Sequence, residues 1–231
     1  MLLILFNEKK TASTFFTAVQ GRFEEKREEN MIYIAVLASG RGTNLQAIID
    51  AIKARKIDGK IKIVISDNPK AYALKRAQDN QIDTMVFPYK QYKSKREYEQ
   101  EILNCLITNN IELITLAGYM RLLGSRIIKE YRHRIINIHP ALLPSFPGLH
   151  AQRQAIEYGV KVSGCTVHFV DEGMDTGPII LQKAVEVRQS DSEETLSERI
   201  LVYEHQLLPR AIQLFAQNKI HIQNNKVYIK E

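Results

Sequence analysis

Asn137 and His139 have the side-chain types that acyl transfer requires and lie two positions apart in an apolar segment. In a β-strand such side chains point to the same side, with Ile138 opposite. An amide N–H can stabilise an oxyanion, and an imidazole can carry a proton to or from the reacting group. An Asn-x-His pair alone is more typical of a structural histidine at a strand end. The pair therefore indicates acyl transfer only if other residues accompany it.

An acidic, glycine-bearing segment, DEGMDTGP at residues 171–178, offers such company. A carboxylate within hydrogen-bond reach raises the pKa of an imidazole and fixes the orientation of its ring. Asp175 is the candidate for this role. The segment lacks the regular oxygen-ligand spacing of an EF-hand, so a solvated acidic loop is its alternative interpretation.

A third motif, SGRGTN at residues 39–44, joins a predicted strand directly to a predicted helix. Free backbone N–H groups at a helix N-terminus bind anions. A dinucleotide-binding fingerprint would place a third glycine at position 45, which is Leu45 in this chain. The motif therefore favours binding of a single phosphate over binding of NAD. The alternative interpretation is that the turn needs glycines for its geometry alone.

Alternating strands and helices must position these motifs. Short β-branched runs predict strands at residues 32–38, 61–66, 84–87, 112–117, 135–138, 162–170 and 178–187. Amphipathic runs predict helices at 44–55, 71–80, 94–109, 125–131 and 192–215, and residues 220–229 predict a hairpin or edge strand. This alternation predicts a Rossmann-like α/β fold, an open and mostly parallel sheet flanked by helices with mixed carboxyl-terminal strands. Asn137 and His139 then lie at the carboxyl end of a strand, where such sheets bind ligands.

The composition of the 231-residue chain narrows the function classes. A net charge of +6 without a Lys/Arg block favours a small anionic substrate over nucleic acid, and no apolar run is long enough to span a bilayer, so no membrane partner is expected. Cys105 and Cys165 lack ligand or CxxC spacing, which predicts no disulfide, no metal site and a cytoplasmic location. Residues 1–30 are interpreted as an extension, either non-native or disordered, with Met31 as an alternative start and 31–231 as a single catalytic domain.

Four ordered motifs resemble the phosphoribosylglycinamide formyltransferase family, a folate-dependent group: SGRGTN at 39–44, LAGYMR at 116–121, NIHP at 137–140 with LLP at 142–144, and DEGMDTGP at 171–178. The similarity extends from residue 31 to about residue 215. It implies the formyltransferase fold and the transfer of a formyl group from the co-substrate 10-formyltetrahydrofolate to the amine of glycinamide ribonucleotide in purine synthesis. A monomer or weak homodimer that uses no metal is expected.

The resemblance also implies a role for each matched residue. His139 would be the general acid, Asn137 would reach the formyl oxygen, and Asp175 would be the partner of His139. The ribonucleotide would contact Gly42, Thr43, Asn44 and Glu204, with Glu204 receiving the glycinamide amine. The folate would lie against Arg96 or, in its place, Lys95, and against Met120, Arg121, Leu122, Leu123, Asn137, Asp171, Glu172, Gly173, Met174 and Asp175.

Three other functions share parts of this pattern. By resemblance, a methionyl-tRNA formyltransferase would carry an additional carboxyl-terminal domain and a formyltetrahydrofolate hydrolase a regulatory domain in front, and the length of this chain is expected to exclude both. A non-catalytic nucleotide-binding module would need only the glycine-rich turn. It would leave Asn137, His139 and Asp175 without a joint purpose.

Overall fold

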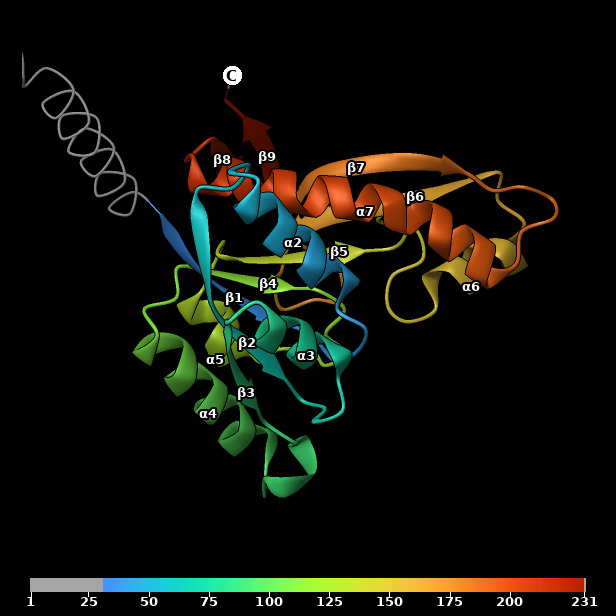
Figure 1. Ribbon diagram of the computed structural model, residues 1–231. Coiled ribbons are helices and arrows are strands. Elements are labelled where there is room, and N and C mark those ends of the chain that lie inside the picture. The colour runs from blue at the N-terminus through green and yellow to red at the C-terminus, as the bar shows by residue number, and fades with distance from the viewer. Residues whose placement is uncertain (1–30, 231) are drawn as a thin grey trace, which may run out of the picture. The chain divides into compact units, whose positions relative to one another are not determined.

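A seven-stranded sheet in the order β3-β2-β1-β4-β5-β6-β7 forms the centre of this computed structural model, which describes residues 31–230 (Figure 1). The strands are β1 (Ile32–Leu37), β2 (Gly59–Ser66), β3 (Asp83–Val86), β4 (Leu113–Leu116), β5 (Ile135–His139), β6 (Val162–Phe169) and β7 (Ile179–Glu186). The first five pair in parallel, whereas β6 pairs antiparallel with both β5 and β7. The predicted mostly parallel sheet with mixed carboxyl-terminal strands is confirmed. The expected extension at residues 1–30 lies outside the described residues.

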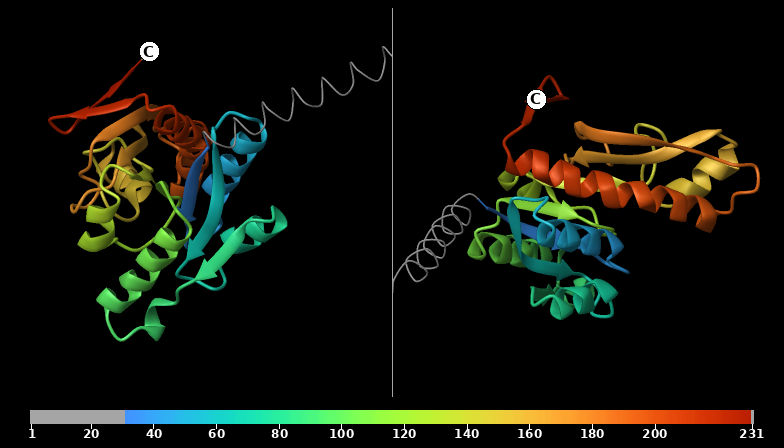
Figure 2. Two further views of the ribbon diagram at one scale, coloured as in Figure 1. Left: turned by 90° about the vertical axis from the view of Figure 1, so that its left-hand side faces the viewer. Right: turned by 45° about the horizontal axis from the view of Figure 1, so that its top comes forward.

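Helices cover both faces of the sheet (Figures 1 and 2). One core contains side chains of α2 (Thr43–Lys53), α3 (Tyr72–Asp79) and α7 (Glu193–Ala216), and the other contains side chains of α4 (Lys95–Thr108) and α5 (Ser125–Glu130). Strand residues alternate between the two cores. In β1, Ile34 and Val36 belong to the α2–α7 core, and Ala35 and Leu37 to the α4–α5 core. This alternation is the period of two expected for a strand that is buried on both faces.

Two short helices escape the sequence prediction, namely η1 (Tyr89–Gln91) and α6 (Ala151–Tyr158). In α6 only Ala151 and Ala155 are buried, so its apolar pattern is too weak to indicate a helix. The hairpin expected at the carboxyl end is present as β8 (Ile220–Gln223) and β9 (Lys226–Ile229). Its turn residues Asn224 and Asn225 both have positive φ angles, of 50° and 61°, which asparagine tolerates well.

The face of β5 and β6 opposite α7 is lined by polar side chains. Ile136, Ile138 and Val167 point into the α2–α7 core. Alternation therefore directs Asn137 and His139 to the opposite face, as predicted. No residue of β6 in the described chain belongs to the α4–α5 core, so this part of the sheet is available to loops rather than to a helix.

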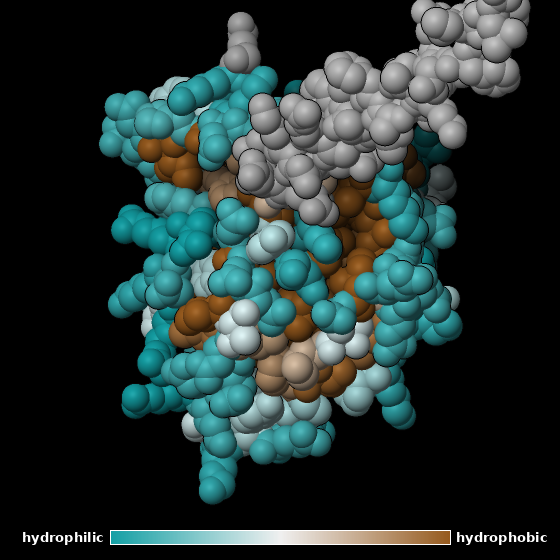
Figure 3. Space-filling view, turned by 60° about the vertical axis from the view of Figure 1, so that its left-hand side comes forward, coloured by the Kyte–Doolittle hydropathy of each residue, from teal (hydrophilic) through white to brown (hydrophobic). Residues whose placement is uncertain are grey.

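The visible surface of the described residues is mostly hydrophilic, with apolar patches between the polar side chains (Figure 3). None of the helices in residues 31–230 is both long and apolar enough to cross a bilayer. The two cores on either side of the sheet contain most of the fully buried apolar side chains, and other large apolar residues, such as Tyr158 and Leu149, remain exposed.

We expect Ile48→Ala to lower the free energy of unfolding by about 2–4 kcal/mol. Truncation of a buried isoleucine reduces the apolar surface that folding removes from water, and it leaves a cavity. Ile48 is 0% exposed on α2, whereas Ile107, 52% exposed on α4, provides the matched control. Ile107→Ala should change stability by less than about 1 kcal/mol. Urea unfolding of both variants tests this, and equal losses would contradict the assignment of the core.

Candidate active site

The carboxylate of Asp175 lies between two buried histidines. Its Oδ2 is 3.4 Å from Nδ1 of His139, and its Oδ1 is 3.6 Å from Nε2 of His168. His168 lies directly opposite Asn137 in the antiparallel β5–β6 register. The structure thus brings together the three predicted residues and adds His168, which none of the sequence motifs contains. A residue opposite Asn137 could have been found only from the strand register.

The loop that carries Asp175 folds back along the sheet. Because β6 is antiparallel to β5, its carboxyl end lies beside the start of β5, whereas His139 is at the end of that strand. Gly177 permits the close return, since a Cβ atom there would lie 1.8 Å from the carbonyl oxygen of Phe169. Asp175 adopts a left-handed φ of 56°, and its Oδ2 accepts a hydrogen bond of 2.8 Å from the backbone N–H of Gly148. Backbone geometry therefore fixes the carboxylate beside the histidines.

Both ring nitrogens of His139 face oxygen atoms of the protein. Nε2 donates to the carbonyl oxygen of Phe146 at 2.8 Å, and Nδ1 is 3.4 Å from the Asp175 carboxylate. N–H···O hydrogen bonds are usually 2.7–3.2 Å long. The Nδ1 contact is therefore the looser of the two, and Nδ1 is the nitrogen that can more readily exchange its partner.

His168 is held as a neutral ring. Burial lowers its pKa below the ordinary value of 6.5, and the nearby charge of His139 lowers it further, against the opposing effects of the Phe169 carbonyl and Asp175. Its Nδ1 is 2.8 Å from the carbonyl oxygen of Phe169, and its Nε2 is 3.1 Å from Nδ2 of Asn137. A lowered histidine pKa means that the uncharged form dominates near pH 7.

The glycine-rich turn packs tightly against α3. Gly42 caps α2 with a left-handed φ of 70°, and a Cβ atom there would lie 2.7 Å from Cα of Ala73. Arg76 braces the same turn, because its Nε donates to the carbonyl oxygen of Arg41 at 2.9 Å. Glycine is therefore required at position 42 by both conformation and space. The predicted helix N-terminus is in place, with α2 beginning at Thr43.

Asn44 and Glu204 meet across α2 and α7. Asn44 Nδ2 donates to Glu204 Oε2 at 2.7 Å, and both side chains are buried. Burial raises the pKa of Glu204, while the hydrogen bond from Asn44 acts in the opposite direction. Oδ1 of Asn44 is buried with no hydrogen-bond partner among the described residues. The structure thus brings Glu204 to the glycine-rich turn and leaves polar capacity there for a ligand.

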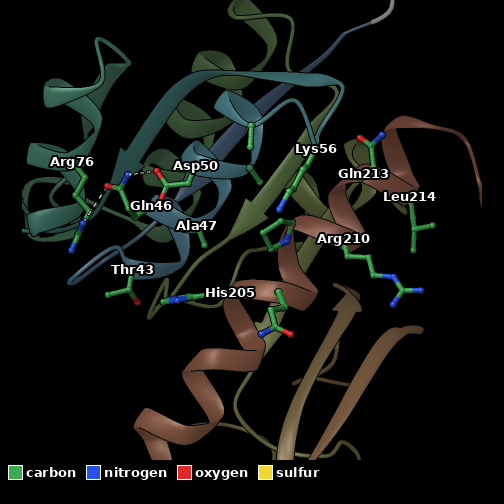
Figure 4. Close-up of a pocket in the computed structure, with 14 residues that line it drawn as sticks. Thr43, Gln46, Ala47, Asp50, Lys56, Arg76, His205, Arg210, Gln213 and Leu214 are labelled. Atoms are coloured by element: carbon green, nitrogen blue, oxygen red, sulfur yellow. Dashed lines mark hydrogen bonds between the residues drawn. The ribbon is translucent and has the colours of Figure 1, made fainter.

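A groove of about 870 Å³ begins at this turn and runs between α2 and α7 (Figure 4). Thr43 and His205 lie at one end, and Gln213 and Leu214 at the other (Figure 4). Its charged lining residues are three cations and one carboxylate, namely Lys56, Arg76, Arg210 and Asp50. The turn therefore opens into a groove with an excess of positive charge, which suits an anionic ligand.

A polar cluster connects the glycine-rich turn to the loop after β4. Asp67, which follows β2, accepts hydrogen bonds from Ser39 Oγ at 2.6 Å and from Arg121 Nε at 2.7 Å. Ser39 Oγ in turn accepts from the backbone N–H of Met120 at 3.0 Å. The Arg121 guanidinium also lies 4.2 Å from the ring centre of Tyr89. Its side chain is therefore engaged within the protein.

The residues expected to contact the folate differ in exposure. Met120, Leu122 and Met174 are large apolar side chains that are at least half exposed, at 64%, 63% and 50%. They lie on the loops that follow β4 and β6. Leu123, by contrast, is a buried member of the α4–α5 core.

The polar members of this expected set lie at the protein surface. Arg96 is exposed at the start of α4, and the alternative Lys95 has its Nζ 3.5 Å from Glu99. In the acidic loop, Glu172 and Gly173 are exposed, and Asp171 accepts a hydrogen bond of 2.7 Å from Thr176. A hydrogen bond within the loop therefore fixes the side chain of Asp171, whereas Glu172 faces solvent.

Comparison with known proteins matches residues 32–212 to the formyl transferase family model. The phosphoribosylglycinamide formyltransferase of Bacillus subtilis is 47% identical over 178 residues, which cover 77% of this chain and 91% of that protein. A crystal structure of glycinamide ribonucleotide transformylase 1 from Symbiobacterium toebii superposes with a TM-score of 0.86 at 48% identity, covering 87% of this chain and 95% of that one.

Two further relatives are longer than the matched region. The trifunctional purine biosynthetic protein adenosine-3 of Drosophila pseudoobscura pseudoobscura is 46% identical over 207 residues, which are 89% of this chain but 15% of that protein. A formyltetrahydrofolate deformylase from Pseudomonas syringae has a TM-score of 0.82 at 28% identity and is covered over 66% of its length. Proteins named for different activities therefore share this fold.

Glu204→Gln should stabilise the folded protein at pH 8 relative to the wild type, because burial disfavours the ionised carboxylate and glutamine carries no charge. Burial raises the folded-state pKa of Glu204 above its ordinary value of 4.5. The wild type therefore loses stability as pH rises from the unfolded pKa through the folded one, and glutamine avoids this loss. Urea unfolding at pH 5 and pH 8 should show the advantage of the variant growing with pH. Glu198→Gln, exposed on the same helix, is the control. A wild type that is as stable at pH 8 as the Glu204→Gln variant would contradict the expectation.

Proposed function

This chain belongs to the formyl transferase family, and we propose that it transfers the formyl group of 10-formyltetrahydrofolate to the primary amine of 5′-phosphoribosylglycinamide in purine synthesis. The observation that carries the proposal is the convergence of Asn137, His139 and Asp175 on one face of the sheet. Relatives named phosphoribosylglycinamide formyltransferase support the choice of substrates. The products are formylglycinamide ribonucleotide and tetrahydrofolate.

The reaction begins with attack of the neutral amine on the formyl carbon. The C–N bond forms as the carbonyl π electrons move to oxygen, which gives a tetrahedral oxyanion. Nδ2 of Asn137 donates a hydrogen bond to this oxyanion, and such a donor is worth about 3–4 kcal/mol when it is aimed at developing charge. Collapse of the intermediate breaks the bond to folate N10. The amine loses a proton and N10 gains one, so that a proton carrier is required.

His139 is the proton carrier in this proposal. With Nε2 donating to Phe146, the additional proton of the imidazolium is on Nδ1, the less tightly held nitrogen, 3.4 Å from Asp175, and this is the proton that passes to the substrate. The carboxylate keeps the ring oriented and balances the positive charge of the imidazolium. Asn137 and Nδ1 of His139 together would then serve both oxygen and leaving nitrogen.

The glycine-rich turn is assigned to the ribonucleotide. Gly42, Thr43 and Asn44 would present backbone N–H groups and side chains to the phosphate. Glu204 would receive the glycinamide amine, and the orphaned Oδ1 of Asn44 offers an additional acceptor beside it. The positively charged groove that opens at Thr43 favours the approach of an anion.

The folate is assigned to the surface formed by the loops after β4 and β6. Met120, Leu122 and Met174 expose apolar side chains that can cover a planar pterin. The backbones of residues 120–123 and 171–175 would provide hydrogen-bond donors and acceptors to the folate. Leu123 and Gly173 would contribute through these backbone groups. Arg96 or Lys95 would meet the anionic tail of the folate.

Several broader features complete the proposal. Residues 31–231 would form one catalytic domain that works in the cytoplasm as a monomer or weak homodimer. Small molecules would be its only required partners, without nucleic acid, membrane or metal.

His139→Ala should lower kcat about 100-fold or more, because general acid–base catalysis contributes roughly that much. The test is a spectrophotometric assay with glycinamide ribonucleotide and 10-formyl-5,8-dideazafolate. His221→Ala, on the exposed hairpin strand β8, should retain full activity. A wild type without turnover would contradict the proposal. Release of the deformylated folate in the absence of ribonucleotide would indicate hydrolysis instead.

Asn137→Ala should reduce kcat by about 10²–10³-fold while leaving the KM for the ribonucleotide unchanged, because the amide acts on charge that develops in the transition state. The same assay measures both constants. Asn104→Ala, exposed on α4, is the matched control. Near-full turnover of the Asn137 variant would remove the amide from the mechanism.

A further inference from the structure

The hydrogen bonds of His168 determine which of its nitrogens carries a proton. A carbonyl oxygen can only accept, so the 2.8 Å contact between Nδ1 and the Phe169 carbonyl places a hydrogen on Nδ1. In the neutral ring Nε2 then carries a lone pair. Its partner at 3.1 Å is the amide nitrogen of Asn137, which must donate. One N–H of the Asn137 amide is thereby directed at His168, and the second has no hydrogen-bond partner among residues 31–230.

We propose that His168 is a positioning residue for the transfer reaction: as a neutral ring with its hydrogen on Nδ1, it accepts from Nδ2 of Asn137 and holds the amide with its second N–H available to the substrate oxygen. The inference rests on the proposed function. His168 itself would not touch the substrate. It acts by preventing rotation of the amide, which would present the carbonyl oxygen of Asn137 to the oxyanion and repel it.

The surroundings explain why an uncharged acceptor is needed at this position. Asp175 Oδ1 is 3.6 Å from the same Nε2. A proton on Nε2 would change this nitrogen from an acceptor to a donor and direct it to Asp175. His168 would then release Asn137 and compete with His139 for the Asp175 carboxylate. The titratable groups that act on the ring are Asp175, Asp171 and His139, and burial outweighs the carboxylates in keeping the ring neutral.

A double-mutant cycle tests the inference. His168→Phe, which removes the acceptor, should lower kcat about 10–100-fold with little change in either KM, less than the loss expected for removal of the donor itself. His168→Gln should recover most of the loss, since its side-chain oxygen can accept from Asn137. In the Asn137→Ala background, His168→Phe should cost less than about threefold, because the group it positions is already absent. An equal fold loss in both backgrounds, or no loss in the single variant, would overturn the proposal.

A second measurement does not depend on activity or on the folding of the variants. The ¹⁵N spectrum of the full-length wild type with labelled histidine should show His168 as a neutral ring with its hydrogen on Nδ1 at pH 7. A charged ring, or a hydrogen on Nε2, would refute the proposal. If the wild type transfers no formyl group but shows this tautomer, the proposed function fails while the contact to Asn137 remains.

Discussion

The candidate site depends on the antiparallel pairing of β6 with β5. This pairing places His168 directly opposite Asn137 and ends β6 at the far end of the sheet from His139. The following loop must therefore return along the sheet, which requires a residue without Cβ at position 177. A parallel β6 would instead end on the same side of the sheet as His139, and its following loop would not have to return. The reversal of strand direction thus provides both the extra histidine and the loop that carries Asp175.

Several features of this site lower the stability of the folded protein. Glu204 and Asn44 are buried together although one amide oxygen has no partner among the described residues, and burial opposes ionisation of the carboxylate. Asp175 occupies a left-handed conformation that non-glycine residues rarely adopt. Buried unsatisfied atoms and unusual backbone angles persist where surrounding structure enforces them, and they concentrate at functional sites. The unpaired Asn44 oxygen at the glycine-rich turn and the backbone conformation of Asp175 in the acidic loop are therefore consistent with ligand binding at these two places.

Much of this arrangement could be predicted from local patterns. Apolar periodicity predicted the seven strands and five of the helices, and a period of two placed Asn137 and His139 on one face. The sequence could not reveal His168, because its relation to Asn137 exists only through the register of strands 31 residues apart. The packing of Leu123 was equally hidden, since its motif predicts a loop at a ligand edge and not which side chain turns into the core. Long-range pairing, rather than residue type, decides both.

Transfer between two bound substrates requires that their sites keep a fixed spacing, because small misplacements of reacting atoms slow such reactions strongly. Asp67 links the two proposed substrate sites in this chain. One carboxylate oxygen holds Ser39 at the glycine-rich turn, the other holds Arg121 after β4, and Ser39 also binds the backbone of the second loop. These contacts lie at the carboxyl ends of the adjacent strands β2, β1 and β4, so the central sheet and this carboxylate together set the distance between the glycine-rich turn and the loop after β4. The guanidinium of Arg121 holds that loop in place through Asp67 and Tyr89, and its contact with the folate stays a prediction.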